Sequence, residues 1–400
     1  QTTLRHQCRM DDAMKPAQRA TKLPPLFFAT VNKKIATLQA AGADVIKLDA
    51  GSPDLPPDVR LIETLKRSAD DPTKHNYGGY AGQPHLRQAI IDHYGQRYGV
   101  ELDEAELVPL LGSKEGIVNM NLAWLDPGDL SLIPDPCYPT YYFAPMLAGG
   151  RTERFDLVEG RGWLPDFRAI PPETAKAARM LWLNYPNNPT GGTATLDFFT
   201  EAVDFCRAYD LLLCHDAPYA DVTYDGHQAP SLLQVPGAKE MAIEFNSLSK
   251  TYSLAGWRIG MAVGCPVAIQ ALATVKTQVD SGLAKPIQDM AAEALVGDQS
   301  WLSPRNAIYR ERRDLCLETI RSLGLETTPP KGGLYVWFRT PPGTTSLEFH
   351  NHLLEKAHVS ITPGHIYGAN GEGWMRISLV ADTTRLAEAL TRLEKILKAE

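Results

Sequence analysis

The sequence has no apolar run of about 18 residues, the length that a membrane-spanning helix needs. It also has no excess of basic residues, since 40 Lys and Arg stand against 47 Asp and Glu and the formal net charge is −7. Nucleic-acid-binding proteins present basic surfaces, so we expect no nucleic-acid partner. The N-terminal residues lack the basic-then-apolar pattern of a secretory signal peptide, and we expect a cytoplasmic protein with no membrane segment.

Cysteine is scarce and shows no motif. The six cysteines include no C-x-x-C pair, and a chain of 400 residues needs no disulfide framework, so we expect reduced and mostly buried thiols. His350 and His352 have a spacing that could suggest metal, but no third ligand follows at a matching distance. We therefore predict no metal site and an exposed histidine face. The chain begins with Gln1, and Met10 and Met14 are candidates for its natural start.

The middle of the chain alternates short apolar runs with helical patterns, which is typical of a parallel sheet covered by helices. The predicted strands are Leu107–Leu111, Leu130–Pro134, Arg179–Asn184, Leu211–His215, Ala242–Asn246 and Arg258–Val263. The predicted helices are Pro84–Tyr98, Glu115–Trp124, Leu196–Tyr209 and Pro266–Val279.

The length of the chain favours two domains. From about Trp301 the pattern changes to a long helical stretch, followed by an apolar segment at Gly332–Phe338 and by further helix and strand signals. We predict an α/β fold with a large domain of residues 46–305. Residues 1–45 and 306–400 would form a smaller α+β domain, so that the large domain is inserted between its two parts.

The stretch from Asn246 to Gly260 places one lysine among hydroxyl groups, with an arginine eight positions further on. Lys250 can form a Schiff base with an aldehyde, and Ser247, Ser249 and Arg258 suit a phosphate ester. Pyridoxal phosphate (PLP) needs both. A lysine between serines is usually a solvated loop residue, so the stretch alone is weak support. The S-x-x-K spacing also occurs in penicillin-binding enzymes, but their S-D-N partner is absent from this chain.

Three elements elsewhere in the chain would complete such a site. Asn188 lies in a turn rich in proline and glycine, which can hold its amide as a rigid donor. Asp216 and Tyr219 follow an apolar strand, where a carboxylate can keep a pyridine nitrogen protonated and a hydroxyl can bond the phenolic oxygen of PLP. Arg376 offers a planar fork to an α-carboxylate. A loop, a strand end and an exposed arginine would explain each one separately, but their joint occurrence favours a PLP site.

An anion site is also predicted at Gly112-Ser113-Lys114. These residues end one predicted strand and open a helix, and the backbone N–H groups at a helix N-terminus bind anions. Ligands of parallel α/β sheets bind beyond the carboxyl ends of the strands, and Asp216 is expected at the same edge.

Together these residues resemble the PLP-dependent class I/II aminotransferases, over about residues 48–393. The resemblance implies the aspartate aminotransferase fold, with a mostly parallel seven-stranded sheet flanked by helices and a smaller α+β domain. It implies a Schiff base between PLP and Lys250, Asp216 on the pyridine nitrogen, and Tyr219 with Asn188 on the phenolic oxygen. It further implies Tyr138 stacked on the cofactor, Ser113, Lys114, Ser247, Ser249 and Arg258 around the phosphate with Gly112 shaping the turn, and substrate bound by Arg376, Asn188 and Gly51.

The family also implies a homodimer. Tyr77, in Tyr77-Gly78-Gly79-Tyr80, matches the family tyrosine that reaches the phosphate of the neighbouring subunit. The implied reaction moves an amino group from an amino acid to a 2-oxo acid by a ping-pong mechanism, with Lys250 as the base. Burial and the charge of Arg258 are expected to lower the pKa of Lys250 toward neutrality.

The substrate is less defined by the residues. Segments between Ala229 and Tyr252, and Val279–Gly282, look most like LL-diaminopimelate aminotransferases, which use 2-oxoglutarate as amino acceptor in lysine biosynthesis. An aminotransferase for alanine, aspartate or aromatic amino acids, or a C–S lyase of the same fold, remains open. A PLP-sensing regulator is disfavoured, because no helix-turn-helix pattern precedes the core. Lys114 and Lys285 are candidates for binding a distal carboxylate.

Overall fold

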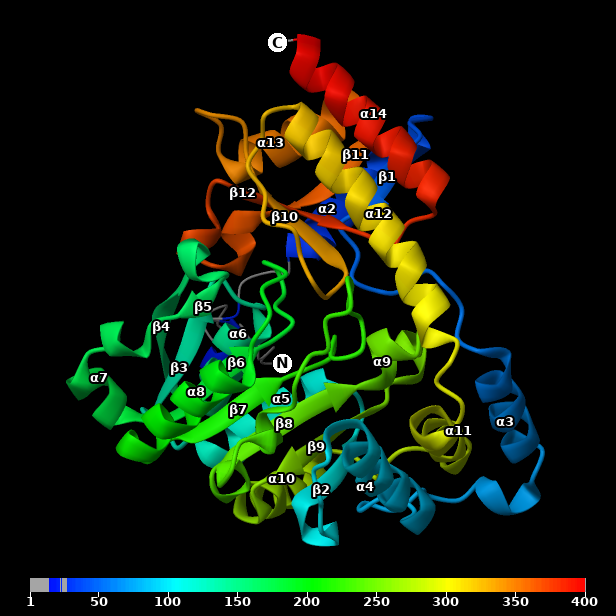
Figure 1. The fold of residues 1–400 in the computed structure, drawn as a ribbon, viewed down its shortest axis with the longest axis vertical. Helices are drawn as coiled ribbons and strands as arrows, with labels where there is room; N and C mark the ends of the chain where they lie inside the picture. Colours follow the sequence, from blue (N-terminus) through cyan, green and yellow to red (C-terminus); the bar gives the residue numbers. More distant parts are fainter. Residues whose placement is uncertain (1–13, 22, 24–26, 400) are drawn as a thin grey trace, which may run out of the picture.

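The computed structural model describes residues 14–21, 23 and 27–399, and these residues form two sheets (Figure 1). The larger sheet occupies the lower half of the view and the smaller sheet the upper half. The larger sheet has the order β2-β9-β8-β7-β6-β3-β4-β5 and the smaller one β1-β11-β12-β10. The strands of the larger sheet are β2 (Leu107–Leu110), β3 (Leu130–Asp135), β4 (Arg151–Val158), β5 (Leu164–Pro165), β6 (Ala178–Asn184), β7 (Leu212–Asp216), β8 (Ala242–Ser247) and β9 (Gly260–Gly264). Those of the smaller sheet are β1 (Ile46–Leu48), β10 (Tyr335–Arg339), β11 (Val359–Pro363) and β12 (Trp374–Ser378).

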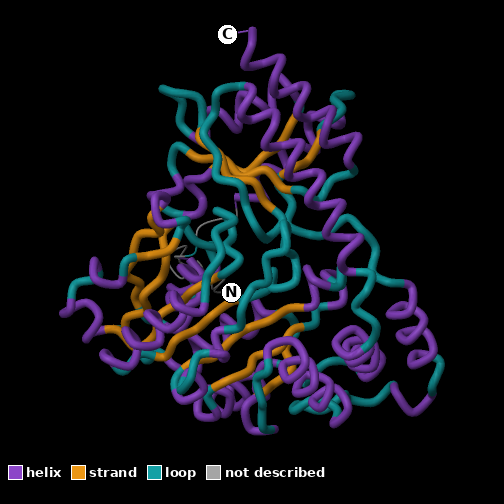
Figure 2. Tube along the Cα trace, in the orientation of Figure 1, coloured by secondary structure: helices purple, strands orange, loops and turns teal. Residues whose placement is uncertain are grey.

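The centre of the larger sheet is parallel. β6 pairs in parallel with β3 and β7, and β8 pairs in parallel with β7, whereas β9 runs antiparallel to β8 and β2. Every residue of β3, β7, β8 and β9 is buried. Strands buried on both faces need helices on both sides, and Figure 2 shows helices around the larger sheet.

The helices of the described residues, in both parts of the molecule, are α1 (Gln18–Thr21), α2 (Phe27–Ala40), α3 (Val59–Ala69), α4 (Pro84–Tyr98), α5 (Ser113–Trp124), α6 (Thr140–Ala148), α7 (Pro172–Ala177), α8 (Leu196–Tyr209), α9 (Leu248–Thr251), α10 (Pro266–Val279), α11 (Lys285–Val296), α12 (Leu302–Ser322), α13 (Ser346–His352) and α14 (Thr383–Ala399).

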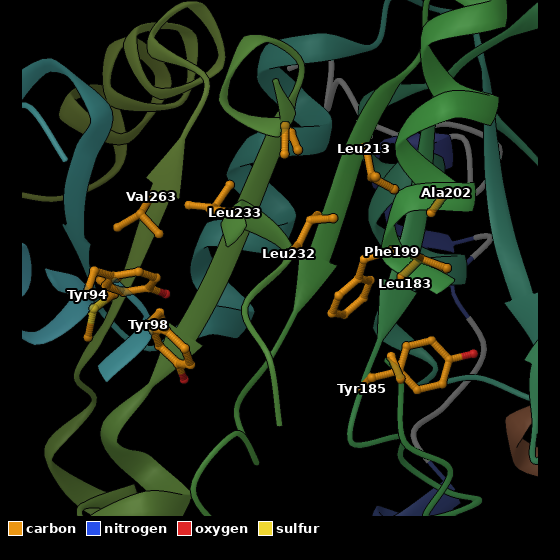
Figure 3. Packing of buried hydrophobic residues seen from close by; sticks show 14 of the residues in the cluster. Tyr94, Tyr98, Leu183, Tyr185, Phe199, Ala202, Leu213, Leu232, Leu233 and Val263 are labelled. Carbon is orange, nitrogen blue, oxygen red and sulfur yellow. The ribbon is translucent and has the colours of Figure 1, made fainter. Parts of the chain in front are cut away.

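Side chains that alternate along the strands pack against two different helical layers. Leu213 on β7 and Val263 on β9 share a core with residues of α4 and α8 (Figure 3). Phe199 and Ala202 belong to α8. Cys214, the residue after Leu213, belongs to a second core that includes residues of α5, α6 and α10. This period of two is the reason that one apolar strand can supply both cores.

The prediction of an α/β fold with a mostly parallel large sheet is confirmed, with one difference. Within the described residues the sheet has eight strands rather than seven, because the two-residue β5 adds an antiparallel edge to β4. A strand of two residues leaves no hydrophobic pattern to detect. The predicted strand at Arg258–Val263 begins later, at Gly260, because the backbone of Arg258 has a positive φ of 57°.

The division into domains at residues 45/46 and 305/306 stays a prediction, with one correction. Ile46–Leu48 was placed at the start of the large domain, but β1 pairs in parallel with β11 of the smaller sheet. The backbone N–H of Ile46 donates to the carbonyl of His358 at 2.8 Å. A three-residue strand with a single exposed position between two buried ones gives too short a pattern to assign to a sheet from sequence.

The histidine pair differs from the expectation. His350 is 2% exposed, contacts Phe27 edge to face, and donates from Nδ1 to the carbonyl of Ile361 at 2.6 Å. The exposed histidine face was therefore wrong for His350. Within the described part of the chain, no group of three or more His, Cys, Asp or Glu side chains is arranged to hold a metal ion.

The described cysteines are unpaired and buried, as expected, whereas Cys8 and Met10 lie outside the described residues. The buried cysteines are Cys137, Cys206, Cys214, Cys265 and Cys316. None of the helices in the described ranges has both the length and the apolar composition required to cross a membrane. The cytoplasmic location stays a prediction.

A hydrogen-bonded pair of a carboxyl and an imidazole lies inside the core of the larger sheet. Glu244 on β8 and His215 on β7 are 1% and 0% exposed. Glu244 Oε1 accepts hydrogen bonds from the hydroxyls of Tyr94 and Ser231, both at 2.9 Å. Its Oε2 accepts from His215 Nδ1 and from the backbone N–H of Leu232, also at 2.9 Å. Burial alone would raise the pKa of Glu244, but these donors outweigh it and hold the pKa below its ordinary value.

Replacing Glu244 with Gln should lower the free energy of unfolding of the cofactor-free protein by about 2–4 kcal/mol. The amide cannot accept all four hydrogen bonds, and buried donors left unpaired are costly. Chemical denaturation followed by circular dichroism measures the change.

The matched control is Glu388→Gln on the exposed face of α14, where Glu388 pairs with Arg385 and Arg392. Its effect should be too small to resolve in the same assay. Because a lowered carboxyl pKa stabilises the fold only above the ordinary value of 4.5, the wild-type advantage over Glu244→Gln should shrink as the pH falls below that value. Equal losses in the two variants would contradict this role of the pair.

Candidate functional site

The predicted site residues gather at the carboxyl ends of three neighbouring parallel strands, β6, β7 and β8. Asp216 is the last residue of β7, and Ser247 is the last residue of β8. Lys250 follows on α9, directly beyond β8. Figure 1 shows α9 on the side of the larger sheet that faces the smaller one. The turn that carries Asn188 begins where β6 ends. This edge is where open parallel sheets bind their ligands.

Asn184, at the end of β6, holds two of these segments together. Its Nδ2 donates to the backbone carbonyl of Asp216 at 2.7 Å, and its Oδ1 accepts the backbone N–H of Asn188 at 2.8 Å. Both bonds are buried, where a lost partner would leave a polar group unsatisfied. The Asn188 turn is therefore fixed relative to the end of β7.

Lys250 is mostly buried, and its Nζ donates to the backbone carbonyl of Gly51. Burial lowers the pKa of Lys250, and the positive charges of Arg376 and Arg258 lower it further. Tyr335 and Asp216 act in the opposite direction but do not reverse the shift. The amine of Lys250 therefore loses its proton more readily than the amine of a surface lysine, which is what a nucleophile or a general base requires.

Asp216 is 3% exposed and has one satisfied and one unsatisfied oxygen. The hydroxyl of Tyr141 donates to Oδ2 at 2.6 Å, whereas Oδ1 is buried and has no hydrogen-bond partner within the described residues. Burial raises the pKa of Asp216 to about 6. A buried carboxylate oxygen without a donor matches a ligand that brings its own N–H group.

A cradle for an anion forms where β2 passes into α5. Gly112 has a φ of 83°, and a Cβ at this position would fall on the guanidinium of Arg258. Arg258, itself at a positive φ, donates from Nη1 to the carbonyl of Ala255 at 2.8 Å and to the hydroxyl of Ser249 at 3.3 Å. Non-glycine residues at positive φ occur preferentially at functional sites. Ser113 opens α5 beside this guanidinium, so a helix N-terminus and a fixed positive charge meet here.

Ser247 supports the cradle through the backbone. Its hydroxyl accepts the N–H of Ser249 at 3.2 Å and caps α9. A Cβ at Gly260 would lie 2.8 Å from both the backbone nitrogen of Ser113 and the carbonyl oxygen of Asn246. Glycine at this position lets β9 pass close to both segments.

Arg376 comes from β12 of the smaller sheet and is 4% exposed. Its Nη1 donates to Asn188 Oδ1 at 2.9 Å, and its Nη2 donates to the carbonyl of Asp49 at 2.9 Å. Its Nε is buried without a partner among the described residues. The ring of Tyr335 lies 3.9 Å from the guanidinium carbon, measured to the ring centroid. The charge is held by neutral oxygens and a ring face, so it stays available to an anionic ligand.

Two site residues were not recognised from sequence, Tyr141 and Tyr335. Tyr141 lies in α6, three residues after Tyr138, and their rings meet edge to face at 5.8 Å. The nearby Tyr138, which precedes the first residue of α6, was the signal available for Tyr141. The hydroxyl of Tyr335 is 2.9 Å from that of Tyr219. Tyr335 occurs in an apolar strand, where nothing local distinguishes it from a core residue.

Three predicted residues do not join this cluster within the chain. Tyr77 is 83% exposed in the loop before α4, and Lys114 is exposed in the first turn of α5. Lys285 donates to the side chain of Asn76, beside Tyr77.

Comparisons with known proteins agree with this geometry. The model of the family "Aminotransferase class I and II" matches residues 43–393. The LL-diaminopimelate aminotransferase of Moorella thermoacetica is 47% identical over 385 residues, which cover 96% of this chain and 99% of that protein. The substrate-bound structure of BacF from Bacillus subtilis has a TM-score of 0.92 at 34% identity, over 96% of this chain and 98% of that chain. A probable N-succinyldiaminopimelate aminotransferase of Thermus thermophilus has a TM-score of 0.87 at 37% identity, over 92% and 99%.

The described residues fit the cofactor of that family, pyridoxal phosphate. Lys250 offers a buried amine of lowered pKa for its aldehyde, and Asp216 offers an unpartnered oxygen for its ring nitrogen. Because Gly112 has no side chain, the guanidinium of Arg258 can lie against the N-terminus of α5, and a phosphate suits this combination of positive charge and helix N-terminus. The family model covers most of the chain, and the Moorella relative is similar along nearly its whole length. The chain therefore belongs to the class I and II aminotransferases, enzymes that use pyridoxal phosphate.

Proposed function

We propose that this enzyme transfers an amino group from LL-diaminopimelate to 2-oxoglutarate, a reaction of lysine biosynthesis. The observation that carries the proposal is the buried amine of Lys250, with its lowered pKa, beside the unpaired charge of Arg376 and the free oxygen of Asp216. The name and near-complete coverage of the Moorella relative support the choice of amino donor.

Lys250 is proposed to bind the cofactor covalently and then to act as the base. Once displaced by an incoming amino acid, its Nζ would take the proton from the substrate Cα and deliver it to C4′ of the cofactor. The carbonyl of Gly51, which accepts a hydrogen bond from Nζ, keeps the amine near the substrate carboxylate site. When bound, pyridoxal phosphate supplies the electron sink that stabilises the negative charge at Cα.

Other residues hold the cofactor in this proposal. Asp216 keeps the ring nitrogen protonated, and its free Oδ1 is the accepting atom. Tyr219 and Asn188 bond the phenolic oxygen, and Tyr138 stacks on the ring. The phosphate is bound by Ser113, Ser247, Ser249 and Arg258, with Gly112 shaping the turn and Lys114 contributing its backbone N–H in the first turn of α5.

Arg376 binds the substrate α-carboxylate. Its guanidinium is fixed by the Asn188 side chain and the Asp49 carbonyl, so its plane is set before substrate arrives. A planar fork matches a carboxylate through two parallel hydrogen bonds. Gly51 is proposed to let its backbone approach the same carboxylate, and a Cβ at this position would lie 2.7 Å from the Tyr335 hydroxyl.

A homodimer completes the site in this proposal. The exposed Tyr77 side chain and the neighbouring Lys285 lie on the loop and helix that would face the second subunit. Tyr77 would then reach the phosphate of the partner's cofactor.

The amino-donor specificity is tested by a panel of substrates with the cofactor-loaded enzyme. We expect a rapid half-reaction with LL-diaminopimelate and slow half-reactions with alanine, aspartate and phenylalanine. The change in cofactor absorbance measures each rate. The reaction with N-succinyl-LL-diaminopimelate distinguishes an LL-diaminopimelate aminotransferase, which should react with it slowly, from an N-succinyldiaminopimelate aminotransferase. Faster reaction with any of these competitors would overturn the substrate assignment, and release of pyruvate from cystathionine without an added oxo acid would instead indicate a C–S lyase.

Replacing Lys250 with Ala should abolish the long-wavelength absorbance of the bound cofactor and reduce turnover by at least about 10⁴-fold, since both covalent binding and proton transfer are lost. Absorbance spectroscopy and a coupled glutamate assay measure the two effects. Lys239→Ala is the control, because the half-buried Lys239 forms an ion pair with Glu106 and with none of the proposed site residues. Wild-type absorbance in Lys250→Ala would refute its proposed role.

Replacing Asp216 with Asn should change the pH dependence of stability of the cofactor-free protein. Folding raises the pKa of Asp216 from 3.8 to about 6, so between pH 3.8 and about pH 6 the carboxyl holds its proton in the folded state but loses it in the unfolded state. The free energy of unfolding therefore falls as the pH rises through this range. The full effect is about 3 kcal/mol at 1.36 kcal/mol per pKa unit. Asp216→Asn should lack this fall, and Asp197→Asn, on the exposed surface of α8, should keep it.

Thermal unfolding followed between about pH 4 and pH 7 provides this measurement. The loaded Asp216→Asn enzyme should also turn over at least about 100-fold more slowly, because an amide cannot hold the ring nitrogen protonated. Identical pH profiles for wild type and Asp216→Asn would show that the carboxyl does not titrate as a buried group.

A further inference from the structure

We propose that Tyr335 is a positioning residue that directs the hydroxyl of Tyr219 toward the ligand and fixes the plane of Arg376. The inference rests on the proposed function, because it concerns how the side chains of the same site are oriented. Tyr335 lies in β10 of the smaller sheet and is 2% exposed. Tyr219 follows β7 of the larger sheet, so a contact between the two hydroxyls joins the two sheets across the site.

Tyr335 contacts Arg376 through its ring face. The guanidinium carbon lies 3.9 Å from the ring centroid, and the two residues are on paired strands, β10 and β12. A second ring, that of Tyr367, lies 5.3 Å from the same carbon. A buried guanidinium over a ring face is stabilised by the ring quadrupole, and its rotation about the side chain is restricted. The ring of Tyr335 therefore helps to hold the fork of Arg376 in the plane that a carboxylate needs.

The hydroxyl of Tyr335 has a different partner. It lies 2.9 Å from the hydroxyl of Tyr219, and either oxygen can be the donor in this geometry. Each tyrosine has one hydroxyl proton, so the direction of this bond decides what Tyr219 offers to a ligand. If Tyr335 donates, the proton of Tyr219 is free for an acceptor on the bound molecule.

The charges around the pair favour that direction. Burial raises the pKa of both hydroxyls, but the guanidinium of Arg376, whose carbon lies 3.9 Å from the ring centroid of Tyr335, and the charge of Lys250 lower the pKa of Tyr335. The pKa of Tyr219 stays raised. The more acidic hydroxyl is the better donor, so Tyr335 donates to Tyr219 and Tyr219 keeps its own proton for the ligand.

Gly51 makes room for this arrangement. A Cβ on Gly51 would lie 2.7 Å from the Tyr335 hydroxyl oxygen, closer than real contacts allow. The backbone carbonyl of the same residue accepts the hydrogen bond from Lys250. A side chain at position 51 would therefore displace the Tyr335 hydroxyl while leaving that carbonyl in the chain.

The test compares Tyr335→Phe and Tyr335→Leu in the cofactor-loaded enzyme. Tyr335→Phe keeps the ring over Arg376 and removes only the hydroxyl. A weaker Tyr219 donor should raise the pKa seen in the pH titration of cofactor absorbance by about half a unit, and lower kcat about tenfold, with KM for 2-oxoglutarate changed less than about threefold. Tyr335→Leu also removes the ring and should raise KM for 2-oxoglutarate about tenfold.

The matched control is Tyr224→Phe. Tyr224 is 3% exposed, and its hydroxyl donates to the carbonyl of Gly333, so this variant loses a buried hydrogen bond two residues before β10 and keeps both the hydroxyl and the ring of Tyr335. It should lower the Tm without moving the spectroscopic pKa or KM. Gly51→Ala is a second, independent variant and should shift the spectroscopic pKa in the same direction as Tyr335→Phe.

The outcomes separate this inference from the proposed function. If the loaded wild-type enzyme shows cofactor absorbance and transaminates, but Tyr335→Phe and Gly51→Ala titrate as wild type does, the positioning role of Tyr335 is overturned and the proposed function stands. A lowered Tm with an unchanged spectroscopic pKa in Tyr335→Phe, as in Tyr224→Phe, would also overturn it. A wild-type protein without cofactor absorbance would overturn both.

Discussion

The structure depends on one buried cation, the guanidinium of Arg376, which joins the two sheets. It projects from β12 of the smaller sheet and donates to Asn188, in the turn after β6 of the larger sheet. Its Nη2 donates to the carbonyl of Asp49, two residues before Gly51. Burying an unpaired charge is costly unless hydrogen bonds and an eventual counter-ion compensate for it. The oxygens and rings around Arg376 stabilise the charge without neutralising it, so the fold keeps a position for an anion between its two sheets.

The same positive charge affects the ionisation of its neighbours. Burial lowers the pKa of Lys250, and the guanidinium of Arg376 adds to that effect. At Tyr335 the charge of Arg376 overcomes burial and lowers the pKa. Asp216 receives less help from positive charge, and burial raises its pKa to about 6. The same arrangement of charges therefore makes the amine of Lys250 easier to deprotonate and leaves the carboxyl of Asp216 able to bind a cationic ligand. The proposed chemistry requires both properties.

The alternation of side chains along β7 separates stability from chemistry. Asp216 points toward Tyr141 and the site, whereas the preceding residue, His215, points into the opposite core and pairs with Glu244. Successive residues of a strand face opposite sides of the sheet, so two buried acid groups can lie on neighbouring strands with different tasks. Glu244 has four donors and a lowered pKa, while Asp216 has one oxygen without a donor and a raised pKa. The count of hydrogen-bond donors distinguishes the structural carboxylate from the one that is open to a ligand.

Much of this fold could be predicted from local sequence, and the exceptions have physical causes. The helices at Pro84–Tyr98, Leu196–Tyr209 and Pro266–Val279 have the predicted bounds, because each combines a clear start signal with a long run of helical periodicity. The two-residue β5 was missed because its place in the sheet depends on pairing rather than on its own sequence.

The site shows the same division between local and long-range information. Lys250 and Asp216 stand directly beyond apolar strands and could be recognised there, and their placement at neighbouring strand ends follows from the parallel order of the sheet. Tyr335 could not be recognised, because its contacts with Tyr219 and Gly51 join residues 116 and 284 positions apart in the chain. A tyrosine in an apolar strand has the pattern of a core residue until the larger sheet places the hydroxyl of Tyr219 and the amine of Lys250 near it, beside Arg376 of its own sheet. The residues that bind by their own chemistry are therefore visible in the sequence, whereas the residue that orients them becomes visible only when the two sheets are brought together.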